Sequence, residues 1–336
     1  MKAELLRYLV CPQCQTHFNL KGVDPRHSGW QWRTQDGKLE CKNGHTYSIN
    51  SGVPVIMNTT DEKQVETAGA FSRKWEGVPD YGYEEKTRDF HRKWYIEKYG
   101  WGDEEVLGDV LFNSKMILDA GCGIGRDVLW YSGHSMSPII GVDISDSAFI
   151  ANAKLDAISN VHIVKADIMN LPFKRQQFDF IVSDFVLHHT PDTRKALCKL
   201  VDYLAPGGYI SFYIYALKDE TREFADDMIR SYTTKMSHED CMKFSKAVTE
   251  FGKAVSEINL ELQRDIYWKL FKCFWNNDFS VDHNVSVNYD WYSPAYAWRH
   301  APWQVLSWCN QLGLERVSID IQQSGISFRG RKPCVG

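Results

Sequence analysis

Three glycines at alternate positions, Gly121, Gly123 and Gly125, follow a short apolar run that ends in Asp119. An apolar run of this length predicts a buried strand, and glycines directly after it let a ligand lie against bare backbone. The spacing is G-x-G-x-G, whereas a pyrophosphate is seated by G-x-G-x-x-G at a helix N-terminus. The turn therefore favours a nucleoside without phosphates, for which S-adenosylmethionine (SAM) is the candidate.

Acidic residues also end the strands predicted after this turn. Asp143, Asp167 and Asp184 follow apolar runs at 138–143, 160–166 and 178–183. In a doubly wound sheet, ligands bind outside the carboxyl ends of the strands, so these carboxylates should gather at one edge. Asp143 lies 24 residues after Asp119 (143 − 119), about where an acidic residue takes ribose hydroxyls. We expect Asp167 to accept from the adenine amine, and Asp119 and Asp184 to lie near the sulfonium and the α-ammonium.

Two pairs of metal-ligand types stand near the N-terminus, Cys11 with Cys14 and Cys41 with His45. Each pair fits on one turn, and two such turns build a tetrahedral structural zinc site. All four positions are then filled, so zinc would stabilise the fold rather than catalyse. His17 is a competing fourth ligand, ranked below His45. The nine cysteines, in a chain without an export signal, indicate a reducing compartment, the cytoplasm, where a metal is favoured over a disulfide.

Two adjacent histidines, His188 and His189, follow the fourth predicted strand of the sheet. A hydroxyl that accepts a methyl group must lose a proton, and a histidine with a pKa near neutrality suits that task. Either histidine could instead cap the next helix. Of the two, His188 is the stronger catalytic candidate because it is nearer to the strand end.

Aromatic residues cluster in two segments that could contact an acceptor. Six lie within 289–303 and seven lie between 71 and 95. Such side chains can stack on a base or a sugar or line an apolar pocket, but they can equally pack a helical segment against the sheet. From these clusters and from the basic end of the last strand we select four candidate substrate residues: Trp75, Tyr292, Tyr296 and Arg329.

Strand-like and helical runs alternate from about residue 115. This alternation predicts parallel strands joined by crossovers, hence an α/β, doubly wound Rossmann-like sheet. We expect seven strands, of which the last two, 316–322 and 325–331, form a hairpin. The expected regions are a zinc ribbon (1–57), a linker (58–66) and helical lid within 58–110, a SAM-binding core (111–216), a helical and aromatic substrate insertion (217–300) and a C-terminal completion of the sheet (301–336).

Five motifs in this order resemble those of class I SAM-dependent methyltransferases of the ubiquinone-biosynthesis type: Asp119–Gly125, Gly141–Ser145, Ala166–Phe173, Phe178–Asp192 and Leu204–Gly208. The resemblance is close over 115–216 and loose over 301–332. It implies that Gly121, Gly123 and the backbone of Cys122 lie under the methionine part of SAM, with the Cys122 side chain in a packing role. The other implied contacts are the ribose with Asp143 and Ile144, the adenine with Asp167 and Ile168, and the amino group with Ser183 or Asp184.

The segment from Cys11 to His45 resembles the N-terminal zinc ribbon of large-subunit rRNA guanine methyltransferases. It is also similar to the small zinc-ribbon activator subunit of several RNA and protein methyltransferases. Residues 1–57 hold seven Lys or Arg and four Asp or Glu. The balance of +3 (7 − 4) is compatible with RNA contact without requiring it.

Three functions are compatible with these features. The first is methyl transfer to an O or N atom of a small molecule of natural-product or sugar type, favoured by the aromatic insertion and the net charge of −4. The alternative is an RNA base methyltransferase that uses the ribbon for RNA recognition, although the chain lacks a strong basic stripe. A further alternative is non-methyl SAM chemistry, such as cyclisation or aminocarboxypropyl transfer. No apolar stretch approaches the roughly 18 residues of a membrane span, and we expect a monomer or a homodimer.

Overall fold

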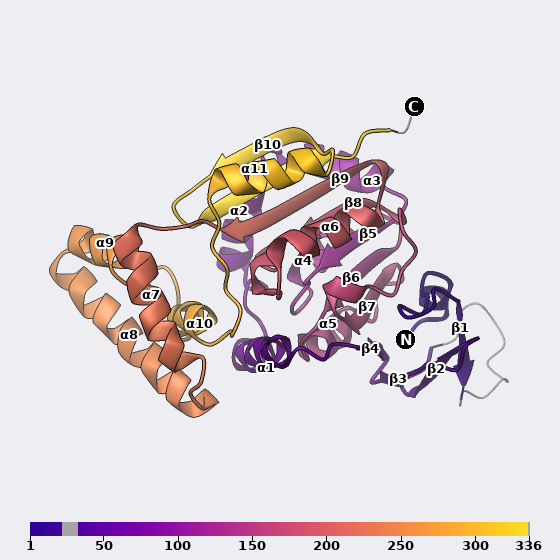
Figure 1. The fold of residues 1–336 in the computed structure, drawn as a ribbon, viewed down its shortest axis with the longest axis horizontal. Coiled ribbons are helices and arrows are strands. Elements are labelled where there is room, and N and C mark those ends of the chain that lie inside the picture. Colours follow the sequence, from indigo (N-terminus) through magenta and orange to yellow (C-terminus); the bar gives the residue numbers. More distant parts are fainter. Residues whose placement is uncertain (22–32, 335–336) are drawn as a thin grey trace.

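The computed structural model describes residues 1–21 and 33–334, and within these ranges one sheet of eleven strands runs through the protein (Figure 1). The strands lie in the order β1-β2-β3-β4-β7-β6-β5-β8-β9-β11-β10. Their bounds are Phe18–Lys21 (β1), Gly37–Cys41 (β2), Thr46–Asn50 (β3), Val53–Ile56 (β4), Ile117–Ala120 (β5), Ile139–Asp143 (β6), Val161–Ala166 (β7), Phe178–Ser183 (β8), Leu204–Tyr215 (β9), Glu315–Ile321 (β10) and Gly325–Arg331 (β11).

The central part of the sheet is parallel. β5 lies between β6 and β8, and β7 and β9 continue the parallel order on the two sides. Every residue of β5 and β6 is buried, as expected for a parallel sheet covered on both faces. β11 pairs antiparallel with β9 and with β10, so the last two strands form the expected hairpin. The strand order reverses at β5, and ligands of such sheets bind at this reversal, outside the carboxyl ends of the strands.

Helices cover both faces of the sheet. Apolar side chains of α2, α3, α4 and α5 form one buried cluster with the strands, and those of α6 and α11 belong to another. The helix bounds are Glu62–Gly77 (α1), Glu85–Lys98 (α2), Glu104–Asn113 (α3), Arg126–Ser132 (α4), Ser147–Leu155 (α5), Thr193–Tyr203 (α6), Glu220–Thr233 (α7), His238–Ile258 (α8), Leu260–Lys269 (α9), Val281–Tyr292 (α10) and Pro302–Gln311 (α11), with short 3-10 turns at Ala3–Arg7, Ile168–Asn170 and Leu187–His189.

The α/β Rossmann-like class is as predicted, and the seven expected strands correspond to β5 to β11, but the sheet continues beyond them. The sheet described here has eleven, because β4 pairs in parallel with β7 and joins the N-terminal hairpin strands to the core. The prediction of a linker over 58–66 also needs correction. Helix α1 begins at Glu62, where the Asp61 side chain accepts a hydrogen bond from the backbone N–H of Gln64 at 2.9 Å.

Four helices, α7 to α10, lie between β9 and α11 and extend beyond the end of the sheet (Figure 1). The Ser237 side chain caps α8 by accepting from the N–H of Asp240. α10 contacts α8 on one side and α1 on the other, so the insertion reaches the helix that follows the N-terminal strands. Among the described residues, no helix combines the length and apolar character needed to cross a bilayer.

Candidate active site

The glycine turn leaves room for a ligand at the end of β5. Gly121 has φ of 97°, and a Cβ there would meet Val186 Cγ2 at 2.2 Å, so only glycine suits the position. Gly123 has φ of 53°, and a Cβ there would lie 3.4 Å from the Trp75 ring. Trp75 thus covers the turn from α1.

The carboxylate of Asp143 at the end of β6 organises the same turn. It accepts from the N–H of Gly123 at 2.8 Å and from the N–H and hydroxyl of Ser145 at 2.8 and 2.6 Å. Asp167 follows β7 and accepts from the N–H of Met169 at 2.9 Å, and burial raises the pKa of its carboxyl. Three backbone N–H groups therefore hold the two carboxylates in place at neighbouring strand ends.

A cavity of about 110 Å³ lies at these strand ends. Its wall includes seven of the predicted cofactor residues together with the ring of Trp75 and one of the two predicted histidines. These are Gly121, Gly123, Asp143, Ile144, Asp167, Ile168, Asp184, Trp75 and His189. The sequence motifs thus converge on one cavity, although they are spread over more than 40 residues of chain.

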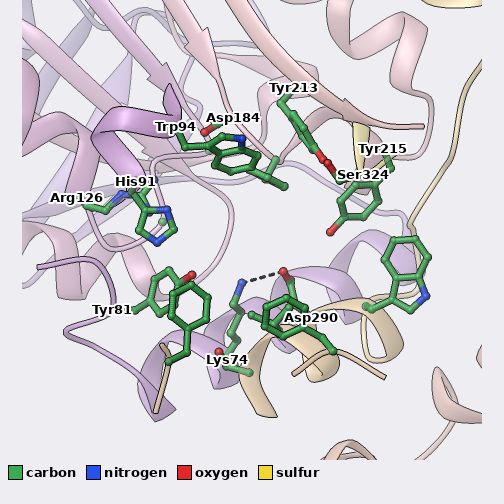
Figure 2. Close-up of a pocket in the computed structure, with 18 of the residues that line it drawn as sticks. Lys74, Tyr81, His91, Trp94, Arg126, Asp184, Tyr213, Tyr215, Asp290 and Ser324 are labelled. Atoms are coloured by element: carbon green, nitrogen blue, oxygen red, sulfur yellow. Dashed lines mark ion pairs between the residues drawn. The ribbon is translucent and has the colours of Figure 1, made fainter. Parts of the chain in front are cut away.

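A second cavity, of about 370 Å³, adjoins the first and is lined largely by aromatic side chains (Figure 2). The two cavities share wall residues from the glycine turn, from α1 and from α10: Lys74, Trp75, Gly121, Gly123, Asp184, Phe185 and Asp290. The far wall of the larger cavity comes from β9 and the helical insertion. A ligand at the strand ends would therefore face a mostly apolar space roofed by the insertion.

Asp119 lines the larger cavity and is buried, with 4% of its surface exposed. Burial raises the pKa of its carboxyl well above the usual range, and the nearby carboxylates of Asp127 and Asp184 raise it further. A positive charge placed beside Asp119 would relieve both effects. This carboxyl therefore suits the cationic end of a ligand on the glycine turn.

Asp184 forms a buried ion pair that the sequence did not reveal. Its carboxylate lies 2.7 Å from Lys98 Nζ and accepts the Tyr99 hydroxyl at 2.8 Å, and Lys98 is 1% exposed. Burial lowers the pKa of Lys98. The Lys98 ammonium also lies 4.0 Å from the centre of the Trp94 ring. Asp184 is thus already neutralised by α2, which argues against its use for the ligand's α-ammonium.

Lys74 of α1 and Asp290 of α10 form a second ion pair, at 3.0 Å, where the two cavities meet (Figure 2). Burial alone would raise the pKa of the Asp290 carboxyl. Lys74 and the other cationic neighbours of Asp290 outweigh this effect, so the pKa is lowered. No spacing in the sequence indicates this pair, because its members are more than 200 residues apart and meet only when α10 packs on α1.

The two predicted histidines differ in position. His188 is fully buried, lines neither cavity and lies against the Tyr215 ring at 3.8 Å, and its ring nitrogens have no hydrogen-bond partner among the described residues. His189 lines the smaller cavity, and its Nδ1 lies 2.7 Å from the Tyr296 carbonyl oxygen. Burial lowers the pKa of His189 to about 4, so its ring is neutral near pH 7. The structure therefore separates His188 from the space where an acceptor fits.

His91 of α2 is the histidine that faces the larger cavity (Figure 2). Burial, reinforced by Arg126, lowers the pKa of His91 to about 3, and its Nε2 has no hydrogen-bond partner among the described residues. No sequence motif indicates His91, because it lies inside a helix and does not follow a predicted strand.

Of the four predicted substrate residues, Trp75 alone lines a cavity. Tyr292 donates its hydroxyl hydrogen to the Lys272 carbonyl at 2.7 Å, and Tyr296 lies 3.1 Å from Asp61. Arg329 lies 3.8 Å from the Trp101 ring centre and donates to the Gly100 carbonyl. These three side chains are used in packing.

Two predicted cofactor residues remain. The Ser183 hydroxyl donates to the Ala120 carbonyl at 2.8 Å and lines neither cavity. Cys122 lines the larger cavity, and burial raises the pKa of its thiol well above the usual value, so it is a poor nucleophile, in keeping with the expected packing role.

The four predicted metal ligands lie together at the N-terminal end of the protein. The ligand atoms of Cys11, Cys14, Cys41 and His45 are all within 4.8 Å of one another. The Cys14 and Cys41 sulfurs are 3.5 Å apart, and His45 Nδ1 is 3.3 Å from the Cys41 sulfur. The competing ligand His17 does not belong to this cluster.

Comparisons with known proteins identify the domain that bears this site. Residues 118–212 match the family described as a methyltransferase domain. The chain is 22% identical over 273 residues to sterol 24-C-methyltransferase of Saccharomyces cerevisiae, covering 67% of this chain and 70% of that protein. It is 33% identical over 124 residues to tRNA (carboxymethyluridine(34)-5-O)-methyltransferase of Arabidopsis thaliana, covering 36% of this chain and 29% of that protein.

Among solved structures, magnesium protoporphyrin IX methyltransferase from Synechocystis, with bound SAM, aligns over 82% of this chain and 99% of that one. The TM-score is 0.46 and the identity 11%. The domain match and the curated relatives show that the chain contains a SAM-dependent methyltransferase domain. Their named acceptors are as different as a sterol and a tRNA, so the similarity does not settle the substrate class.

Proposed function

We propose that this protein transfers the methyl group of SAM to an O or N atom of a small molecule. The observation that carries the proposal is the junction of the two cavities. The smaller one has the glycine turn and the strand-end carboxylates, and the larger, aromatic one opens from it beneath the insertion. When bound, SAM supplies an electrophilic methyl group on a sulfonium.

The residues of the smaller cavity suit a SAM molecule at three points. Gly121 and Gly123 line the smaller cavity without side chains, so the methionine part can lie against their backbone. Asp143, fixed by three hydrogen bonds, has lone pairs left for the ribose hydroxyls. Asp167 keeps one carboxylate oxygen for the adenine amine, and Asp119 offers a carboxylate to the cationic groups.

On the acceptor side, the aromatic wall excludes water and orients the acceptor for in-line attack. The His91 ring is neutral at pH 7, and its Nε2 has no hydrogen-bond partner among the described residues. In place of His188, it is our candidate to accept a hydrogen bond from the hydroxyl or amine of the acceptor and to orient it. We expect His91→Asn to lower kcat with little change in SAM affinity, whereas His188→Asn should act mainly on the free energy of unfolding. Steady-state kinetics and thermal unfolding of the two variants measure this difference.

The RNA alternative has less support. No residue of 1–57 that the structure describes lines either cavity, so the ribbon does not contribute to the acceptor space. The test uses SAM with a labelled methyl group and a cell extract. A labelled product that survives RNase supports the proposal, and label that RNase removes would replace it with RNA methylation. Mass spectrometry of the product distinguishes methylation from cyclisation or aminocarboxypropyl transfer.

We further propose that Cys11, Cys14, Cys41 and His45 hold a structural Zn²⁺. Thiolate and imidazole are preferred zinc ligands, and four of them suit a closed tetrahedral site. The metal would tie the turn after Val10 to the turn between β2 and β3. We expect about one zinc per chain by elemental analysis. Cys14→Ser should lose the metal and lower the Tm, whereas Cys334→Ser, at an exposed cysteine, should change neither.

A further inference from the structure

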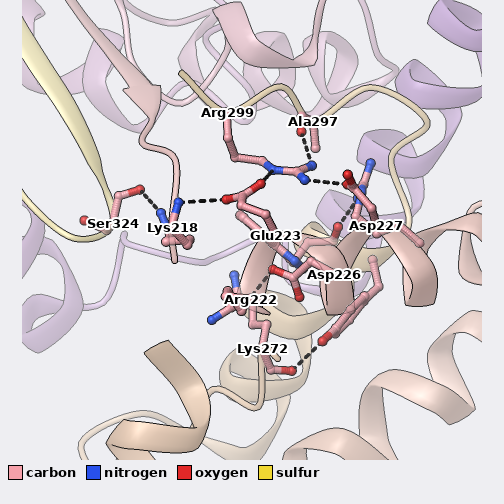
Figure 3. Close-up of polar contacts among 12 residues, drawn as sticks. Lys218, Arg222, Glu223, Asp226, Asp227, Lys272, Ala297, Arg299 and Ser324 are labelled. Carbon is pink, nitrogen blue, oxygen red and sulfur yellow. Dashed lines mark hydrogen bonds and ion pairs between the residues drawn. The ribbon is translucent and has the colours of Figure 1, made fainter. Parts of the chain in front are cut away.

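Three cationic side chains line the larger cavity on the side of the helical insertion, and we call this set the cationic corner: Lys218, Arg222 and Lys272. Lys218 follows β9, Arg222 lies in α7, and Lys272 lies between α9 and α10. Figure 3 shows the corner beside Ser324, together with the carboxylates that surround it. The insertion thus brings three positive charges from separate segments to one wall.

Arg222 is the most buried member of the cationic corner, with 1% of its surface exposed. Its Nε lies 2.5 Å from Asp226 Oδ2, but its Nη1 has no hydrogen-bond partner among the described residues. A buried guanidinium donor without a partner costs about 1–3 kcal/mol unless something satisfies it. Asp226 Oδ1 also has no hydrogen-bond partner among the described residues. Arg222 lines the cavity and Asp226 does not, so the cation is the member of this pair that belongs to the cavity wall.

The two lysines have no carboxylate partner among the residues that the structure describes. Lys218 Nζ donates to the carbonyl oxygens of Ala216 and Ser324, at 2.8 and 3.1 Å. Lys272 Nζ lies 5.0 Å from the Trp291 ring centre and makes no hydrogen bond with a described residue, although Lys272 is only 6% exposed. Burial lowers the pKa of Lys218 to about 8 and that of Lys272 to about 7. Burying these two ammonium groups in their charged form therefore costs folding free energy.

The other charges around the cavity cancel in pairs. Lys74 pairs with Asp290, Lys98 with Asp184, and Arg126 with Asp127. Behind the corner, Arg299 pairs with Glu223 and Asp227, and Arg222 with Asp226. What remains unpaired on the wall is Asp119 beside the glycine turn and the two lysines of the cationic corner.

The cationic corner and the glycine turn lie at opposite ends of the cavity. In Figure 2, His91 and Arg126, which starts the helix after the glycine turn, lie on one side, and Tyr215 and Ser324 lie on the other. Lys218 contacts Ser324, so the corner belongs to the second side. A SAM molecule seated on the glycine turn with its charged end at Asp119 would leave the corner free.

We infer that the acceptor carries an anionic oxygen group, a carboxylate or a phosphate, and that this group binds in the cationic corner while the rest of the acceptor lies among the aromatic side chains. The inference rests on the proposed methyl transfer and names the chemical class of its acceptor. A guanidinium and two ammonium groups are the donors that such anions prefer. The anion would balance the charge of the two lysines that have no carboxylate partner, with the Arg222 guanidinium in the wall beside them.

The test measures binding of three probes to the full chain in the presence of S-adenosylhomocysteine: 4-hydroxybenzoate, phenyl phosphate and the neutral 4-hydroxybenzamide. We expect at least one of the anions to bind about tenfold or more tightly than the amide, because a charge-assisted hydrogen bond contributes about that factor. Whichever anion binds better distinguishes a carboxylate from a phosphate. Equal affinity for all three probes, or no binding of any, would overturn the inference.

Variants locate the anion. Lys272→Gln and Arg222→Lys, which keeps a cation beside Asp226, should each weaken the anionic probe about tenfold and leave the amide within twofold. The control is Lys269→Gln, an exposed lysine that pairs with Asp265 and changes the net charge equally. If the preference for the anion survives in both corner variants, the corner is not its site.

The same variants separate this inference from the proposed function. SAM affinity should be unchanged in Lys272→Gln, while the KM of the extract acceptor should rise about tenfold. If the wild-type chain binds no SAM and transfers no label, the proposed function fails. If it transfers label to a product that an anion-exchange resin does not retain at pH 8, only the inference about the acceptor fails.

Discussion

The two ends of the active-site cavity are built in opposite ways. At the strand ends, the carboxylates of Asp143 and Asp167 are held by backbone N–H groups, and all of them come from one stretch of chain. At the insertion, the charges are positive, come from three separate segments and are only partly satisfied by protein atoms. Protein atoms thus satisfy the charged groups at the strand ends, whereas the charged groups at the insertion need a ligand to satisfy them.

This difference agrees with the two molecules that a methyltransferase must hold. The cofactor is the same in every such enzyme, so its site can be rigid and preorganised. The acceptor differs between enzymes, and its site lies on an insertion that the core sheet does not require. Substitutions at the strand ends should therefore affect cofactor binding and folding, and those at the insertion should affect the acceptor alone.

The largest effect is expected from Gly121→Ala at the glycine turn. The added Cβ would clash with Val186 at 2.2 Å and keep a positive φ of 97°, which together should lower the free energy of unfolding by about 3 kcal/mol. Gly102→Ala is the matched control, because its φ is 84° and its Cβ would meet nothing within 4 Å. Chemical denaturation measures both. Equal losses in the two variants would mean that the turn is not closely packed.

Asp143→Ala should weaken SAM binding about 100-fold, since it removes a buried carboxylate that orders the Gly123 N–H as well as the proposed ribose contact. Calorimetric titration with SAM measures this change. Asp146→Ala, at an exposed carboxylate that pairs with Lys165, should leave the affinity within twofold. If Asp143→Ala binds SAM with unchanged affinity, SAM does not bind at the strand ends as proposed.

Binding of an anion at the acceptor end should weaken as the pH rises above 7. Burial, and also Arg222, lowers the pKa of Lys272 to about 7, while Asp290 opposes the shift, and the pKa of Lys218 is about 8. Both ammonium groups are charged below pH 7 and lose their protons as the pH rises through 7 and 8. The Kd of 4-hydroxybenzoate should therefore increase about tenfold between pH 7 and 9. In Lys272→Arg, whose side chain stays charged, the Kd should increase less over this pH range. A Kd that does not change with pH in the wild type would contradict the prediction.

The smallest effect is expected from Tyr296→Phe. The Tyr296 hydroxyl lies 3.1 Å from Asp61 and the residue lines neither cavity, so we expect a loss of less than about 1 kcal/mol in the free energy of unfolding. Acceptor and SAM affinities should not change. A clear rise in the acceptor KM would show that Tyr296 reaches the substrate after all.

Sequence reasoning predicted the α/β class because strand and helix patterns alternate over a long, regular segment. It did not predict that the sheet continues from β7 through β4 to the N-terminal strands, because this pairing joins residues about 110 positions apart and leaves no local pattern. It also selected His188, which follows a strand end, over His91, which faces the cavity from within α2. The direction of a side chain depends on packing, and adjacency to a strand end does not fix it.

By itself, the sequence determined the glycine turn, the order of the acidic strand ends and the grouping of the four proposed zinc ligands. These features depend on spacing within one or two turns of chain, where backbone geometry leaves few alternatives. Only the tertiary structure decided which charges remain unpaired. Lys98 pairs with Asp184 and Lys74 pairs with Asp290, in each case from distant parts of the chain. Within residues 1–21 and 33–334, the Nζ atoms of Lys218 and Lys272 form no ion pair with a carboxylate. Each of these ion pairs joins residues from different elements. The balance of charge around the cavity is therefore set only when the chain has folded.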